Sequence, residues 1–120
     1  TMAGFYGNPT ARNVSVGTVY CPRGAWTALQ TGSAPRGNRQ WIMMQVKGRC
    51  SLAVQYVNVA ADGTFTAPTV NLATIKQAII YPANSVVQLP ISDSVTVYGR
   101  AVAKAGATEG GVLVALAEFS

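Results

Sequence analysis

The clearest structural signal in this chain is the stretch QWIMMQVK at residues 40–47. Its side chains alternate, so that Ile42, Met44 and Val46 fall on one face of an extended strand while Trp41 falls on the other. A period of two residues is typical of a β-strand and does not fit a helix. The stretch therefore predicts a strand with one fully apolar face.

A second apolar strand follows almost immediately. The tripeptide Lys-Gly-Arg at 47–49 makes a tight connection into residues 51–58, where Leu52, Val54 and Tyr56 share a face. Two such strands joined by a short turn predict a β-hairpin.

Strand signals recur on both sides of this pair. Further strands are expected from Val14 to a stop at Cys21-Pro22, and at 26–29, 86–91, 94–101 and 112–119. Turn residues separate them at 31–38, 60–64 and 82–85. Seven to eight short strands with turns between them predict an all-β fold, an antiparallel β-sandwich or barrel with jelly-roll-like connections.

The last expected strand, 112–119, is apolar on both faces. One face carries Val112, Val114 and Leu116, and the other carries Leu113, Ala115 and Phe119. A sheet with one wet face does not need this pattern. The strand is therefore expected either to be covered on both sides or to belong to an interface.

The stretch 65–81 is ambiguous. Within it, Leu72, Ile75 and Ile79 recur at helical spacing, while its β-branched residues favour a strand. We expect strand or extended structure here.

Composition indicates one domain that is partly covered by other protein. Hydrophobic residues make up 49% of the 120 residues and charged residues only 11%, against a usual share of about 25%. We expect a single β-sandwich domain at 14–120, preceded by an extended N-terminal arm at 1–13. The arm either frays or anchors on a neighbouring subunit through Phe5 and Tyr6, which are costly to expose.

The N-terminal residues carry no sign of a leader or a membrane segment. Gly4, Gly7, Asn8 and Pro9 interrupt the region where a signal peptide has its apolar run. No stretch reaches the roughly 20 apolar residues of a membrane helix. We expect a protein that is used without secretion and without a membrane.

The residues that most catalytic sites require are scarce. There is no histidine, which excludes Ser-His-Asp and Cys-His arrangements, and only four Asp or Glu are present. Gly106–Gly111 lacks the GK[ST] ending of a phosphate loop. We therefore expect no enzyme activity, no metal, no cofactor and no small-molecule substrate.

Cys21 and Cys50 leave two possibilities open. A disulfide would close a loop of about 30 residues and contribute roughly 3–4 kcal/mol. An unsecreted protein more often keeps its thiols free and buried, and this is our expectation.

The formal charge is +5, from nine Lys or Arg against four acids. The cations are scattered, and only Arg36 with Arg39 and Lys47 with Arg49 approach clusters. Solvated loop charges explain this pattern most simply; a patch that faces another protein is the next interpretation, and nucleic acid is disfavoured.

The order of several motifs resembles a class of small virion proteins of tailed bacteriophages. The motifs are GAWTAL at 24–29, NRQWIMMQV at 38–46, PANSVVQLPI at 82–91, SVTVYG at 94–99 and the closing AEF at 117–119. The similarity extends over residues 24 to 119 and departs from the pattern at 59–81.

This resemblance implies a capsid decoration, or cement, protein. Such a protein has a jelly-roll-like sandwich, binds the outside of the capsid at capsomer junctions and stabilises the shell. The implied partners are the major capsid protein and further copies of the chain, as a trimer or dimer. The implied location is the virion surface after synthesis in the host cytoplasm. The expected partner-binding residues are Phe5, Tyr6, Arg12, Arg36, Arg39 and Trp41.

Two alternatives from other classes remain open. One is a tail, head-fibre or receptor-binding module whose exposed aromatics, such as Trp26 and Tyr98, stack on a host glycan. The other is a basic nucleic-acid binder of the OB type, for which Trp41, Met43 and Lys47 on one strand face are a weak signal.

Overall fold

A computed structural model describes residues 13–68, 78–102 and 110–120, which form strands and loops without a helix. The strands are β2 (Val14–Pro22), β3 (Thr27–Ala28), β4 (Trp41–Lys47), β5 (Ser51–Asn58), β6 (Ile79–Tyr81), β7 (Val86–Leu89), β8 (Val95–Val102) and β9 (Gly111–Phe119). The all-β prediction is confirmed. The N-terminal arm predicted at 1–13 lies outside the described residues except for Asn13.

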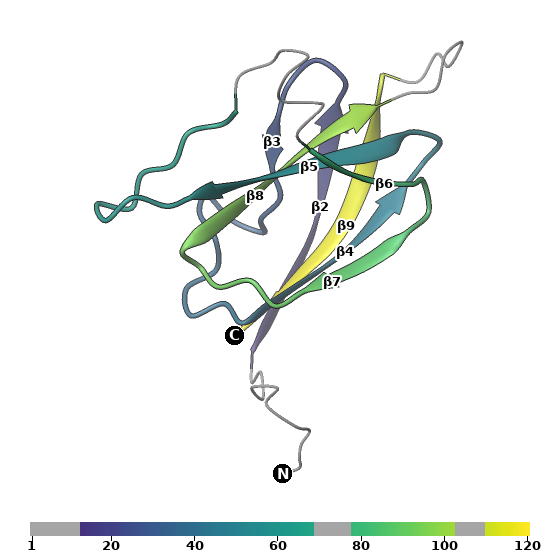
Figure 1. The fold of residues 1–120 in the computed structure, drawn as a ribbon. Coiled ribbons are helices and arrows are strands. Elements are labelled where there is room, and N and C mark those ends of the chain that lie inside the picture. Colours follow the sequence, from purple (N-terminus) through teal and green to yellow (C-terminus); the bar gives the residue numbers. More distant parts are fainter. Residues whose placement is uncertain (1–12, 69–77, 103–109) are drawn as a thin grey trace.

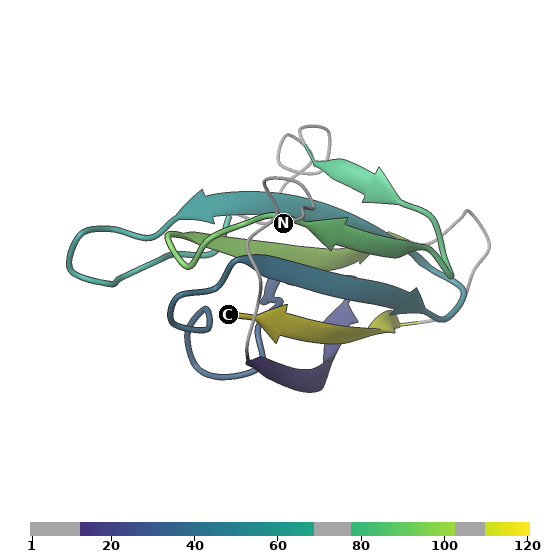
Figure 2. The same cartoon turned by 90° about the horizontal axis from the view of Figure 1, so that it is seen from below.

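Two four-stranded antiparallel sheets pack face to face as a sandwich (Figures 1 and 2). The strand orders are β2-β9-β4-β7 and β3-β8-β5-β6. The pairing is nested along the chain, because β2 pairs with β9, β3 with β8, β4 with β7 and β5 with β6. This is the pairing of one long hairpin folded over on itself, and it makes residues far apart in sequence neighbours.

The core lies between the two sheets. β4 contributes Ile42, Met44 and Val46, the three residues that the alternation of 40–47 predicts on one face, and all three are completely buried. Leu52 and Val54 of β5 meet them from the other sheet. Gly99 on β8 leaves room for this packing, since a Cβ there would lie 3.0 Å from the side chain of Leu52 and 3.1 Å from that of Leu29.

The predicted hairpin between 40–47 and 51–58 is wrong. β4 pairs with β7 and β9, whereas β5 pairs with β6 and β8, so the Lys-Gly-Arg connection carries the chain from one sheet to the other. Gly48 makes the crossing with a φ of +134°. The physical reason is that both strands have a fully apolar face, and the two faces bury each other best from opposite sheets.

The remaining loops largely follow their sequence signals. The Asp62-Gly63 turn closes with a bond from the Gly63 amide to the Ala60 carbonyl, and 82–85 closes with a bond from Ser85 to the Pro82 carbonyl. In the ambiguous stretch, residues 65–68 lack regular structure, 69–77 lie outside the described residues and Ile79–Tyr81 forms β6.

Part of the outward side of the β3-β8-β5-β6 sheet is covered by the chain itself. Trp26, Ala53 and Tyr98 form a second buried cluster there, and Phe65 from the segment after β5 packs against it. Parts of β5 and β8 are therefore buried on both sides. The outward side of the β2-β9-β4-β7 sheet lacks such cover among the described residues, and the candidate site lies there.

Candidate functional site

The outward side of the β2-β9-β4-β7 sheet, called here the outer face, is an apolar surface that no described part of the chain covers. The pairing register puts neighbouring side chains on this side into cross-strand rows. The outer face consists of Val14, Val16, Thr18 and Tyr20 on β2, Leu113, Ala115, Ala117 and Phe119 on β9, Trp41, Met43, Gln45 and Lys47 on β4, and Val86 and Gln88 on β7.

Exposure of large apolar side chains is concentrated on the outer face. Seven large hydrophobic residues are exposed among the described residues, and five of them belong to this face: Val14, Val16, Tyr20, Val86 and Leu113. Val16 is 75% exposed. Single exposed hydrophobic residues are ordinary, but a contiguous patch marks an interaction site.

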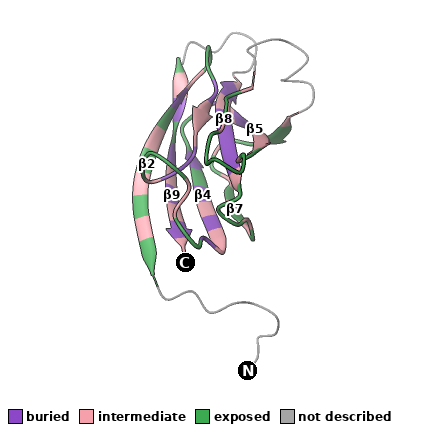
Figure 3. Ribbon diagram, turned by 90° about the vertical axis from the view of Figure 1, so that its left-hand side faces the viewer, coloured by how far each residue is buried: buried purple, intermediate pink, exposed green. Residues whose placement is uncertain are grey.

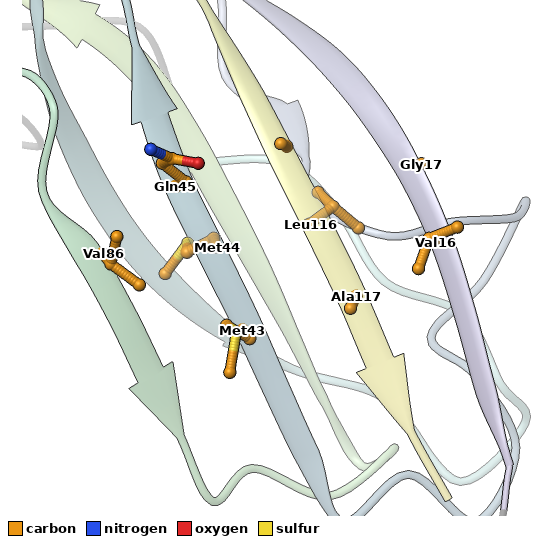
Figure 4. Close-up of a pocket in the computed structure, with 9 residues that line it drawn as sticks. Val16, Gly17, Met43, Met44, Gln45, Val86, Leu116 and Ala117 are labelled. Carbon is orange, nitrogen blue, oxygen red and sulfur yellow. The ribbon is translucent and has the colours of Figure 1, made fainter.

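A hollow of about 290 Å³ lies near the middle of the outer face (Figure 4). Met43 of β4, Ala117 of β9 and Val16 of β2 line it in adjacent strands, and Val86 of β7 closes the far side. The small side chains of β9 are the cause, since alanines at 115 and 117 stand between larger neighbours. A partner's apolar side chain fits such a depression.

The sequence pattern anticipates this surface in part. β9 is central in its sheet, between β2 and β4, as its double apolar character suggests. Its inner face is buried, while Leu113 on the outer side is exposed. Of the two possibilities left open for this strand, coverage on both sides is not found among the described residues.

Among the described residues, the outer edge of this sheet has no partner strand. There β2 pairs only with β9, and its nine residues, VSVGTVYCP, contain no charged side chain. It forms the curved outer margin of the molecule (Figure 3). Charged residues and bulges usually protect a long exposed edge strand from pairing. An apolar edge strand next to an apolar face makes one continuous surface suited to binding another protein.

The predicted partner-binding residues lie in different parts of the structure. Trp41 lies half-buried on the outer face beside Phe119. Arg36 is half-buried, and its Nε donates to Ser120 Oγ at 2.8 Å. Phe5, Tyr6 and Arg12 lie outside the described residues.

Arg39 was predicted to bind a partner, but the structure places it in the interior. Its side chain is completely buried in an ion pair with Glu118, with Nη1 and Oε2 2.7 Å apart. The other guanidinium nitrogens donate to the carbonyls of Ile91, Ser92 and Val95. Every donor nitrogen thus has a partner inside the protein, so Arg39 holds the fold together and does not face a partner.

Glu118 binds the loop between β3 and β4 to β9. It accepts hydrogen bonds from the Thr31 amide at 2.6 Å, the Thr31 hydroxyl at 2.8 Å and the Arg36 amide at 3.0 Å, besides the bond from Arg39. Burial by itself raises the pKa of this carboxyl, but the four hydrogen bonds outweigh burial and hold its pKa below the ordinary value. The sequence identified Arg39 but gave no indication of its carboxylate partner, which lies 79 residues away.

The aromatics proposed for glycan stacking are buried. Trp26 is 6% exposed and Tyr98 5% exposed, both within the cluster under the Phe65 segment. Neither can offer a ring face to a sugar. For the OB-type alternative, Trp41, Met43 and Lys47 do share the outer face, but Lys47 is the one cation among the residues that make up that face.

The described acids take structural roles. Asp62 accepts from the amide and hydroxyl of Thr64, Asp93 accepts from the Asn38 amide, and Glu118 is in the buried network. In residues 13–68, 78–102 and 110–120, no group of His, Cys, Asp or Glu is arranged to hold a metal ion. The same residues contain no helix able to span a bilayer.

The two cysteines are unbonded and buried, as expected. Burial raises the pKa of the Cys21 thiol to about 12, and a thiol that stays protonated is a poor nucleophile. We expect no fast reaction of Cys21 with Ellman's reagent at pH 8 in the folded protein. After unfolding in denaturant without reductant, two thiols per chain should react; fewer than two would show a disulfide.

Comparison of this chain with protein-family models, with curated proteins and with solved structures found no match.

Proposed function

We propose that this chain is a structural virion protein that binds the outside of a bacteriophage capsid at capsomer junctions and stabilises the shell. The observation that carries the proposal is the uncovered apolar outer face, with the hollow between Val16, Met43 and Ala117 at its centre. A chain that exposes such a surface is built to be covered by another protein.

The topology supports a jelly-roll fold as the finer description of the sandwich. The eight strands of the described residues lie in two sheets, with β2 paired to β9 and the other pairs nested within this one, as expected when a long hairpin is rolled up. Jelly rolls of this kind are frequent among viral capsid domains and lectins. A fold does not fix a function, so the apolar face carries the main weight of the proposal.

The position of Asn13 supports a role for the arm. Asn13 and Ser120 exchange two backbone hydrogen bonds of 2.8 and 2.9 Å, which places the start of β2 beside the end of β9. Asn13 therefore lies at the margin of the outer face, next to Val14 and Phe119. In the proposed function, the arm and the outer face act together, with Phe5 and Tyr6 as anchors.

The mechanism is added buried area at each junction. A specific interface buries about 1,600 Å² in total. Repeating the same contact over a closed shell opposes separation of the capsomers, since many contacts must break together. Self-association into a trimer or dimer increases the number of contacts made by each bound unit.

Two measurements test the proposal. Purified protein should bind expanded shells, assembled from the major capsid protein of the same genome, at a saturating and fixed ratio. The free protein should have the mass of a trimer or dimer by light scattering. A monomer that ignores these shells, yet binds a glycan or single-stranded DNA with micromolar affinity, would overturn the proposal.

A further inference from the structure

Four cations collect at the end of the sandwich where the arrows of β2, β4 and β8 terminate in Figure 1. β2, β4 and β8 end here and β9 begins here, as the pairs Pro22 with Gly111 and Lys47 with Leu113 show. The cations are Arg23, Lys47, Arg49 and Arg100. Lys47 and Arg49 are two residues apart, but Arg23 and Arg100 are far from them in sequence, so the gathering of all four results from the topology.

Hydrogen bonds join part of this set across the two sheets. The Arg23 amide donates to the Gly110 carbonyl at 3.0 Å, and Arg100 Nε donates to the Arg23 carbonyl at 2.5 Å. Arg23, Lys47 and Arg49 are exposed. We call these four residues the cationic end.

The described acidic residues lie elsewhere. Asp62 follows the far end of β5, and Asp93 precedes the start of β8, both at the opposite end of the sandwich. Glu118 is buried against Arg39 near the end of β9. Residues 103–109, which contain Lys104 and Glu109, lie outside the described residues. Within the described residues, the net positive charge therefore lies at the cationic end, whereas the opposite end carries Arg36 and Arg39 together with the three acids.

The cationic end is continuous with the outer face. Tyr20, Leu113 and Lys47 form one cross-strand row, so an exposed ammonium group stands directly beside exposed apolar side chains. An apolar centre with a charged margin is the usual anatomy of a protein interface.

We infer that the surface bound by the outer face is an acidic protein surface, with carboxylates placed to meet the cationic end. This inference rests on the proposed function and specifies the chemistry of the partner. A nucleic acid fits less well, because such sites interleave several aromatics with cations. On the outer face one aromatic, Tyr20, lies beside Lys47, whereas Trp41 and Phe119 lie at the opposite end from the cations.

The test compares two variants of equal net charge. K47Q/R49Q removes two cations from the cationic end, and S33D/A34D lowers the net charge equally in an exposed loop at the other end. Thermal unfolding checks that both variants fold. Association rates with the expanded shells are measured at about 0.1 M and about 1 M salt, where the Debye length falls from roughly 10 Å to about 3 Å.

We expect K47Q/R49Q to associate about 3–10-fold more slowly at the lower salt, with the difference lost at the higher salt. S33D/A34D should stay within about twofold of the unmodified protein. Equal rates for all three proteins, with shell binding intact, would overturn the inference alone. Shell binding that is unaffected, combined with salt-sensitive binding of a single-stranded DNA oligonucleotide that K47Q/R49Q abolishes, would also overturn it. Failure of the unmodified protein to bind shells would instead contradict the proposed function.

Discussion

Replacing Glu118 with glutamine should cost about 3–5 kcal/mol of unfolding free energy at pH 7, the range seen when one partner of a buried ion pair is removed. Arg39 would remain completely buried with a neutral partner, and no water can reach it at 0% side-chain exposure. An amide can also accept fewer hydrogen bonds than the carboxylate, which now accepts four. Urea denaturation followed by circular dichroism measures the loss.

Two further variants give this prediction its controls. D93N changes an exposed carboxylate that accepts one backbone bond from Asn38, so its effect should be much smaller. The double variant R39M/E118L should lose less than the sum of its single changes, because no unpaired charge is left in the interior. An E118Q protein as stable as the unmodified one would contradict the structural role assigned to the pair.

The free energy of unfolding at low pH should also depend on the Glu118 carboxylate. The pKa of Glu118 in the folded protein lies below its ordinary value of 4.5. Its contribution to stability is therefore complete above the unfolded pKa, and is lost as the pH falls from there through the folded pKa. The stability difference between the unmodified protein and E118Q should narrow on acidification below about pH 4.5.

The second large effect concerns shell binding. Val16→Glu places a carboxylate beside the central hollow of the outer face, where Val16 is 75% exposed and contributes little to folding. Burying that charge against a partner without a counter-charge carries a large desolvation cost. We expect at least about 30-fold weaker binding to expanded shells, corresponding to the 2 kcal/mol or more of a central hot spot.

Ile80→Glu is the matched control for this variant. Ile80 is 46% exposed on β6 of the other sheet, so the same charge is added at another exposed β-branched residue. Both variants change the net charge equally, which removes long-range electrostatics from the comparison. Sedimentation with shells should show I80E bound and V16E free. Equal binding of the two would contradict the assignment of the outer face.

The alternation of apolar and polar residues along the strands predicted only part of the proposed site. The double apolar character of 112–119 left two alternatives, a central strand covered on both sides or a strand in an interface. The strand is central, and its outward residues form the middle of the outer face. Trp41 is on that face as well. Val16 and Val86 were not singled out, although strict alternation in their strands contained the signal, because alternation does not tell which face points inward.

What the sequence determined by itself is the set of strands and most of their turns. The period of two at 40–47 and the Asp-Gly and Pro-Ala-Asn turns depend on backbone geometry within a few residues, so local chemistry decides them. The tertiary structure alone decided which strands pair. In the tertiary structure, β4 and β5 lie in different sheets, and Trp26 and Tyr98 are buried. Arg39 pairs with Glu118, and the four residues of the cationic end lie at the same end of the sandwich. These outcomes depend on which apolar faces bury each other most completely, and that competition involves the whole chain at once.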